Sequence, residues 1–256
     1  MLHHETAGEG QAVVLLHCAL CDGRQWDRQM KTFAHDFQVV RLDLPGFGRS
    51  PFPSGTFSHA DDVLGLLDEL GIEQTALVGN SMGGDIARDV ALTAPERVWA
   101  LVLVDAGHPG VERSPEVAEY NERENALIEA GDVGGAVDLN LRFWLDGPRR
   151  GPDVVDSGVR VRVAEMQRLA LENYLALEAE PGPETGPEGL SGDIRCPTLV
   201  IVGDQDQPGM LAAADRYAAE IPGARKAVIA GAAHIPSLER PDEFDALVLD
   251  FLRSLT

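Results

Sequence analysis

The sequence has few basic residues for its length. Lysine and arginine together number 21 among 256 residues, against 42 aspartates and glutamates, which gives a formal net charge of −21. A surface of this sign repels phosphate backbones and anionic lipid headgroups, so we expect no nucleic acid and no membrane among the partners. The charge favours solubility but carries no information about the fold.

The sequence also lacks the marks of disulfide scaffolds and membrane proteins. Three cysteines, Cys18, Cys21 and Cys196, are too few and odd in number for a disulfide framework. No run approaches the roughly 18 continuous apolar residues that would span a bilayer. The first residues, Met1 to Glu5, have neither the basic start nor the apolar stretch of a signal peptide. We therefore expect a cytoplasmic protein.

What the chain does contain is an alternation of short apolar runs and longer amphipathic stretches. The apolar runs are 13–16, 39–42, 76–78, 98–104, 198–202 and 227–229. Nearly continuous apolar runs indicate strands that are covered on both faces, as in a parallel sheet flanked by helices. Helical patterns over 59–70, 82–93 and 241–255 alternate with them, which predicts an α/β fold built from βαβ units.

The alternation is interrupted between residues 107 and 192. This segment has no strand pattern, and its helical patterns cover about 115–130, 132–145 and 153–179, followed by a Pro/Gly/Glu-rich loop over 181–192. An all-helical insertion between two parallel strands indicates a lid over the strand ends. We therefore predict an α/β core of residues 1–106 and 193–256 and a helical cap of residues 107–192. The cap is inserted before the strand at 198–202, which is followed by the acidic residues discussed below.

A Gly-x-Ser-x-Gly pattern, Gly79 to Gly83, stands directly after a predicted strand and before a predicted helix. In that context the turn is so tight that side chains at positions 79 and 83 would collide with nearby backbone. It exposes the hydroxyl of Ser81 at the helix N-terminus, where the helix dipole favours developing negative charge. The pattern predicts Ser81 as a nucleophile.

Acidic residues and a histidine follow two later strands. Asp204 and Asp206 come after the strand at 198–202, and His234 comes after the strand at 227–229. The carboxyl ends of parallel strands meet at one edge of the sheet, which brings these side chains toward Ser81. The order Ser, acid, His is that of a hydrolase triad on such a sheet. The residues alone leave both aspartates open as the acid.

With these residues, the sequence resembles the α/β-hydrolase superfamily over nearly its whole length, in its compact, lid-bearing serine carboxylesterase and lactonase branch. Residues 15–19, Leu-Leu-His-Cys-Ala, resemble the strand that ends in His-Gly. Residues 43–50 resemble the Asp-x-x-Gly-x-Gly-x-Ser turn, and residues 234–241 resemble the segment of the catalytic histidine.

The resemblance implies a catalytic role for each matching residue. Ser81 matches the nucleophile, His234 the general base, and Asp206 the acid, because the family places the acid three residues after the glycine at position 203. The oxyanion hole would be formed by the backbone N–H groups of Ala19 and Met82.

Cys18 departs from the pattern, because the family has glycine at this position. We expect its side chain to reshape the oxyanion loop. The Cys18–Cys21 spacing also permits a redox or metal function, but no second cysteine pair exists for a zinc site. We predict packing cysteines, no metal and no cofactor.

Five residues are predicted to contact substrate. Two are tryptophans, near the oxyanion loop and in an aromatic cluster of the cap, and the others follow a strand end, lie on a cap helix, or follow the catalytic histidine. They are Trp26, Trp144, His108, Met166 and Ile235. For Trp26 a place in the core is the stronger interpretation.

The resulting function is hydrolysis of a carboxylic ester of a small, neutral, apolar substrate through an acyl-enzyme, by a monomer or homodimer. The alternatives are an enol-lactonase or a carbon–carbon bond hydrolase of ring-fission products. Asn80 fits the carbon–carbon hydrolases of the family, whereas Ile235 stands where they tend to have tryptophan. A perhydrolase or a non-catalytic ligand-binding module is a more distant alternative.

Glutamates crowd the start of the predicted cap, at positions 112, 116, 119, 122 and 124. If they face the entrance, they disfavour anionic substrates, and this is why we expect a neutral one.

Overall fold

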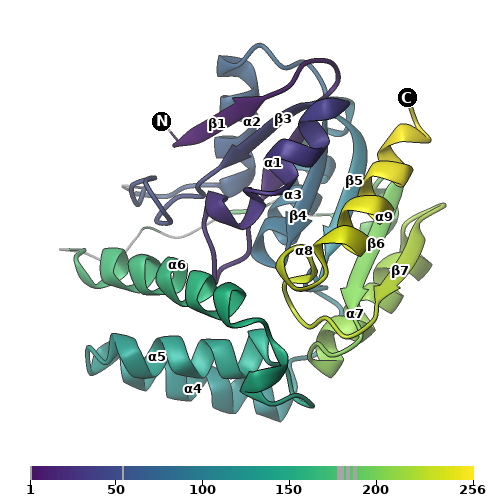
Figure 1. Ribbon diagram of the computed structural model, residues 1–256. Coiled ribbons are helices and arrows are strands. Elements are labelled where there is room, and N and C mark those ends of the chain that lie inside the picture. The colour runs from purple at the N-terminus through teal and green to yellow at the C-terminus, as the bar shows by residue number, and fades with distance from the viewer. Residues whose placement is uncertain (1, 54, 178–181, 183–184, 187–188) are drawn as a thin grey trace.

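The computed structural model describes residues 2–53, 55–177, 182, 185–186 and 189–256. Within these residues, seven strands form one sheet in the order β1-β3-β2-β4-β5-β6-β7 (Figure 1). The strands are β1 His4–Ala7, β2 Ala12–Leu16, β3 Gln38–Leu42, β4 Thr75–Asn80, β5 Val98–Val104, β6 Thr198–Gly203 and β7 Arg225–Ile229. All neighbouring pairs are parallel except β1 with β3. The predicted α/β-hydrolase fold, with its mostly parallel central sheet, is confirmed.

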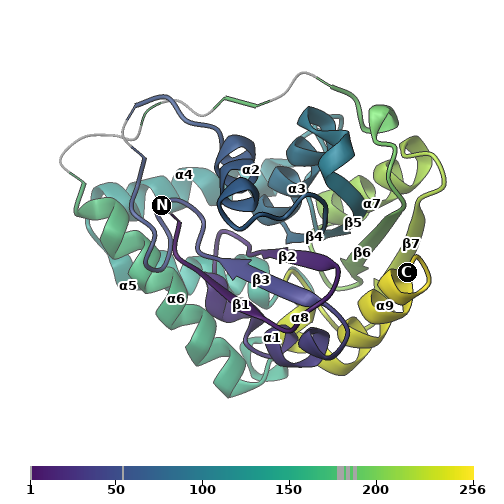
Figure 2. The same cartoon turned by 90° about the horizontal axis from the view of Figure 1, so that it is seen from above.

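Helices cover both faces of this sheet (Figure 2). The helices α2 His59–Glu69, α3 Met82–Thr93 and α7 Pro208–Glu220 bury apolar side chains on one face. The helices α1 Gln29–Thr32 and α9 Pro241–Arg253 do so on the other, where the short α8 Pro236–Glu239 leads into α9. Successive residues of β2 alternate between these two cores, which is why its sequence is apolar throughout.

The predicted strands and core helices all form, with ends shifted by no more than a few residues. Strand β1 was not predicted, because it lies at the edge of the sheet and has no apolar run. Its residues pair antiparallel with β3, from His4 opposite Leu42 to Ala7 opposite Val39. Backbone hydrogen bonding rather than burial creates this strand.

Between β5 and β6, the described residues form three α-helices, which lie below the carboxyl ends of the strands in Figure 1. They are α4 Pro115–Glu129, α5 Val133–Asn140 and α6 Ser157–Leu175. The pattern expected as a helix over 132–145 ends as an α-helix at Asn140 and continues as a π-helical turn, Leu141–Leu145. The described residues of this segment contain no strand, and part of the predicted 181–192 loop lies outside the described residues. The limits of the cap, 107–192, stay a prediction.

The cap is joined to the core by an apolar cluster of its own. Its members come from the oxyanion loop, the cap helices and the loop after β7: Cys18, Leu20, Cys21, Ala136, Val137, Leu141, Leu145, Val155, Val163, Met166, Leu171 and Ile235. In the part of the chain described, no helix combines the length and apolar composition needed to cross a bilayer.

Candidate active site

Ser81 occupies a strained turn between β4 and α3. Its backbone has φ +53° and ψ −116°, a conformation that L residues rarely adopt, and its N–H donates to the carbonyl of Val104 at 2.8 Å. A Cβ on Gly79 would overlap the carbonyl of Gly83, and a Cβ on Gly83 would overlap the carbonyl of Leu16. Both glycines are therefore required by the close approach of backbone to the turn.

Asp206 and His234 form a buried hydrogen-bonded pair. Nδ1 of His234 and Oδ2 of Asp206 are 2.7 Å apart, and the other oxygen of Asp206 accepts the N–H of Gln207 at 2.7 Å. Asp204, the other candidate acid, accepts the N–H of Gly231 at 2.7 Å and holds the loop after β7. The structure thus places Asp206, and not Asp204, against the histidine.

The surroundings of His234 shift its proton affinity. Burial lowers the pKa of its imidazole, but the charge and hydrogen bond of Asp206, aided by the charge of Glu239, outweigh burial and raise the pKa above its ordinary value of 6.5. The aspartate therefore stabilises the imidazolium that a general base forms.

Asn80 connects the serine turn to the histidine loop. Its Nδ2 donates to the backbone carbonyl of His234 at 3.0 Å, and its Oδ1 accepts from Nε2 of Gln25 at 2.8 Å. Within the described residues, the hydroxyl of Ser81 makes no hydrogen bond to the imidazole of His234. Such bonds are commonly long without substrate and tighten when it binds. Gln25 was not among the residues predicted from the sequence. Its hydrogen bond to Asn80 supports both the serine turn, which contains Asn80, and the histidine loop, to which Asn80 donates.

The loop after β2, which is predicted to supply a donor of the oxyanion hole, is fixed by buried hydrogen bonds. The N–H of Cys18 donates to Oε1 of Gln25 at 3.0 Å, and His17 bridges the carbonyl of Cys18 and the N–H of Leu44, each at 2.9 Å. Because the N–H of Cys18 is used, Ala19 remains as the next donor of the loop. Met82 is the first residue of α3, where a backbone N–H has no acceptor within the helix.

A cavity of about 510 Å³ opens at Ser81. The indole of Trp144 lines it and packs on the imidazole of His234, with ring centroids 4.5 Å apart. His108 also lines this cavity, but its ring nitrogens interact with the N–H of Gly110 and with the carboxylate of Glu220. Trp144 and His108 therefore both line the cavity at Ser81, and the imidazole of His108 is held by other protein groups. A contact of either residue with substrate stays a prediction.

The charges around this cavity are mixed. Asp85 and Glu112 line it, and so do Arg88 and Arg113. The other glutamates expected at the entrance do not line it, and Glu124 accepts a hydrogen bond from Asn140 at 2.7 Å. The sequence led us to expect an excess of acidic residues at the entrance. Around the cavity at Ser81, however, two acidic residues are balanced by two arginines.

A second cavity, of about 560 Å³, opens at Ala19, between the core and helices α4 and α6. Most of its lining is apolar, including Phe47, Phe52, Ile128 and Leu171. Glu129 is the charged residue among the lining residues described. The two cavities are thus lined by different residues of the predicted site, Ser81 in one and Ala19 in the other.

Three residues expected to contact substrate lie elsewhere. Trp26 is fully buried on the α1/α9 face of the sheet, with its ring centroid 6.0 Å from that of Phe244. Met166 and Ile235 are buried in the cluster between cap and core, and neither lines the two cavities. Each is oriented by packing between elements, which its own position in the sequence does not reveal.

Asp105 is a further acidic group at the site. It follows β5 with φ +44°, is buried, and accepts the N–H of Gly203 at 2.9 Å. Ligand atoms of Asp105, Asp206 and His234 lie within 4.8 Å of one another, which is close enough for a metal ion. Nδ1 of His234 already takes part in the hydrogen bond with Asp206, however. Asp105 was not predicted from the sequence. The signal that could have identified it is its position directly after the strand β5.

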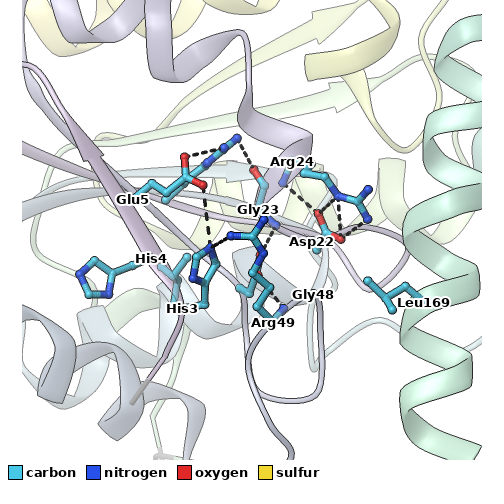
Figure 3. A pocket seen from close by; sticks show the side chains of 12 residues that line it. His3, His4, Glu5, Asp22, Gly23, Arg24, Gly48, Arg49 and Leu169 are labelled. Carbon is cyan, nitrogen blue, oxygen red and sulfur yellow. Dashed lines mark hydrogen bonds and ion pairs between the residues drawn. The ribbon is translucent and has the colours of Figure 1, made fainter.

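A smaller pocket of about 220 Å³ lies beside the turn 43–50, away from Ser81 (Figure 3). Its arginines are engaged by neighbouring acids: Arg24 pairs with Asp22 and Arg41 with Glu5. Arg49 contacts His3. The pocket contributes no residue to the site around Ser81.

With this geometry in place, the chain can be compared with known proteins. The family model described as "Alpha/beta hydrolase family" matches residues 13–247. The chain belongs to this alpha/beta hydrolase family. It is therefore a hydrolase, as predicted, and the esterase and lactonase branch expected from the sequence is confirmed by the similar structures described next.

Three proteins that are similar to this chain differ in the reactions for which they are named. A 2-hydroxy-6-oxononadienedioate/2-hydroxy-6-oxononatrienedioate hydrolase from Klebsiella pneumoniae is 30% identical over 98% of this chain and 90% of its own. An enol-lactonase from Burkholderia xenovorans is 27% identical, with a TM-score of 0.80 over 98% of this chain and 96% of its own. A thermophilic esterase from Thermogutta terrifontis is 26% identical, with a TM-score of 0.80 over 99% and 93%.

Proposed function

We propose that this alpha/beta hydrolase is a serine enzyme that transfers an acyl group to Ser81 and then to water. The observation that carries the proposal is the buried Asp206–His234 pair, 2.7 Å apart and tied through Asn80 to the turn of Ser81. A positioned base beside a serine at a helix N-terminus is the arrangement that activates a hydroxyl nucleophile.

The reaction proceeds in two halves. His234 takes the proton of Ser81 as Oγ bonds to the substrate carbonyl carbon, and the N–H groups of Ala19 and Met82 stabilise the oxyanion. The bond to the leaving group breaks, and the leaving group departs with the electron pair and takes the proton from His234. Water, deprotonated by His234, then releases the carboxylic acid and restores Ser81.

For the leaving group we propose an enol, cleaved from an enol lactone or from the carbon–carbon bond of a dienone. This reverses the order expected from the sequence, where a simple ester came first. The relatives favour the change: the Klebsiella protein is named as a hydrolase of 2-hydroxy-6-oxononadienedioate, a compound of the dienone class, and the similar Burkholderia structure is an enol-lactonase. The enol lactone releases its enolate through oxygen. In the dienone, the enol proton first moves from oxygen to the carbon that will depart, so that this carbon leaves as a conjugated enolate and not as a vinyl anion. A simple ester remains the second candidate, favoured by Ile235 in place of tryptophan and by the similar esterase.

We further propose that the substrate group beside Ala19 is neutral and apolar. The cavity there is lined by Phe47, Phe52 and Leu171, and a carboxylate in it would meet Glu129 with no arginine or lysine among the described lining residues. Burial of a charge without a partner is costly, so an anionic group there lowers affinity.

The test uses wild type and Ser81→Ala on a panel of an enol lactone, a ring-fission dienone and a short p-nitrophenyl ester. We expect the lactone or dienone to be turned over at least about tenfold faster than the ester, and Ser81→Ala to lose about 10⁴-fold or more of kcat. Equal activity of wild type and Ser81→Ala would refute the nucleophile, and a faster ester would return the simple ester to first place.

A further inference from the structure

Glu239 holds the backbone on both sides of His234. Its Oε1 accepts the N–H of Ala233 at 3.0 Å and the N–H of Ile235 at 3.2 Å. The side chain is only 4% exposed, so these bonds to an ionised acceptor are shielded from water. The direction in which the imidazole leaves the loop therefore depends on this carboxylate.

The other oxygen of Glu239 pairs with Arg150, a residue of the segment between β5 and β6. Nη2 of Arg150 lies 2.6 Å from Oε2 of Glu239, and the arginine side chain is 8% exposed. Burial raises the pKa of the Glu239 carboxyl, and the charge of Arg150 opposes this. Removing either partner would leave the other charge buried and uncompensated.

Arg150 also holds the cap wall that lies against the histidine. Its N–H groups donate to the carbonyls of Leu145 at 2.6 Å and Asp146 at 2.8 Å, the two residues after Trp144. A further N–H donates to the carbonyl of Gly231, in the histidine loop, at 2.7 Å. One guanidinium thus spans the backbone beside Trp144 and the loop that carries His234, and Trp144 and His234 are themselves in ring contact.

We infer that Arg150 and Glu239 are positioning residues, which couple the position of the cap relative to the core to the orientation of His234. The inference rests on the proposed function, in which His234 is the general base. The fork of an arginine is essential to it, because one lysine ammonium cannot reach three carbonyls and a carboxylate in this fixed arrangement. When the cap lies in this position on the core, Trp144 faces the substrate and, through the same contacts, the imidazole of His234 is oriented toward Ser81.

The experiment compares Arg150→Met with a matched control, Arg162→Met. Arg162 is also a residue of the predicted cap that pairs with a core acid, Asp27, and it donates to the carbonyl of Arg24. Among the described residues, it has no hydrogen bond to the histidine loop or to the backbone beside Trp144. Using the fastest substrate of the panel, we expect Arg150→Met to lower kcat about 10²-fold with KM changed less than about threefold, since small misplacements of a base have effects of this size. Arg162→Met should change kcat less than about threefold.

Arg150→Lys and Glu239→Gln keep the test decisive if Arg150→Met folds poorly, as judged by circular dichroism. The lysine variant should lose about tenfold in kcat. In Glu239→Gln, a negative charge near His234 disappears while Asp206 and Cys18 remain, so the acid limb of kcat/KM should move to lower pH. The double variant Arg150→Met/Glu239→Gln should lose less than the product of the single losses, because the two side chains act as one unit.

Three results would overturn the coupling: equal kcat losses in Arg150→Met and Arg162→Met, full activity in Arg150→Lys, or an unmoved pH profile in Glu239→Gln. Failure of the proposed function is distinguished by Ser81→Ala, measured alongside. If Ser81→Ala retained full activity, the triad itself would be wrong, whatever the Arg150 variants did.

Discussion

The carboxyl groups of Asp105 and Asp206 lie close to each other and to the imidazole of His234, with ligand atoms of all three within 4.8 Å of one another. They come from the ends of two adjacent strands, β5 and β6, and both are buried. Burial raises the pKa of Asp105 well above its ordinary range, and the charge of Asp206 raises it further. Two carboxylates at one site do not both ionise readily, so the raised pKa favours the protonated form of Asp105.

This relationship predicts a reserve acid. In Asp206→Asn the neighbouring charge is gone, so the pKa of Asp105 falls and its carboxylate can support His234 in part. We expect Asp206→Asn to lower kcat, and Asp105→Asn/Asp206→Asn to lower it at least about tenfold further. Asp105→Asn alone, the control, should have a small effect on kcat, because the raised pKa of Asp105 already favours its neutral form. Identical kcat values for the single Asp206 variant and the double variant would rule out the reserve role.

The pH dependence follows from the raised pKa of His234. The base must be neutral to accept the proton of Ser81, so kcat/KM should rise with pH through an apparent pKa above 6.5. Asp105→Asn/Asp206→Asn removes both carboxylates that can favour the imidazolium, so its acid limb should lie at lower pH than that of the wild type. An acid limb in the same position in both proteins would argue against a carboxylate partner of His234.

The serine turn predicts an unequal response to two glycine substitutions. Gly83→Ala places a Cβ against the carbonyl of Leu16 and should lower the free energy of unfolding by about 3 kcal/mol or more. Gly65→Ala, in helix α2, meets nothing within 4 Å and should raise it by about 0.5–1 kcal/mol. Urea denaturation measures both, and similar stabilities of the two variants would contradict the steric account.

Two tryptophans should separate binding from folding. Trp144 lines the cavity at Ser81, so Trp144→Ala should raise KM or lower kcat by about tenfold with a small change in stability. Trp26 is a core residue, so Trp26→Ala should lower stability by about 3–5 kcal/mol. Steady-state kinetics with thermal denaturation would tell them apart. An altered KM in Trp26→Phe, with Trp144→Ala unaffected, would reverse the assignment.

Chelation provides a test of the acidic cluster around His234. Because Nδ1 of His234 is hydrogen-bonded to Asp206, we expect activity to be unchanged after treatment with a chelator and after addition of zinc. Activity that is lost with the chelator and restored by zinc would instead make Asp105, Asp206 and His234 a metal site.

Much of the architecture could be predicted from local patterns. The buried strands carry continuous apolar runs because helices cover both faces of the sheet, and the helices between them show their periodicity. The edge strand β1 escaped prediction because its residues are held by pairing with β3 and not by burial. The π-helical turn after Asn140 was missed for a similar reason, since a helical pattern does not distinguish the two hydrogen-bonding schemes.

Ser81 could be proposed as a nucleophile from its neighbours in sequence, because the Gly-x-Ser-x-Gly pattern and the helix that begins directly after Ser81 are local features. The steric reason for the glycines is only partly local. Gly79 lies against the carbonyl of Gly83, whereas Gly83 lies against the carbonyl of Leu16, which tertiary packing brings to the turn. The choice between Asp204 and Asp206 depends on which of them contacts His234, and Asp206 is 28 residues from His234 in the sequence. Arg150 and Glu239, which form an ion pair, are 89 residues apart. Which buried charges meet depends on how the cap and the strand ends are brought together, and only the tertiary packing determines that.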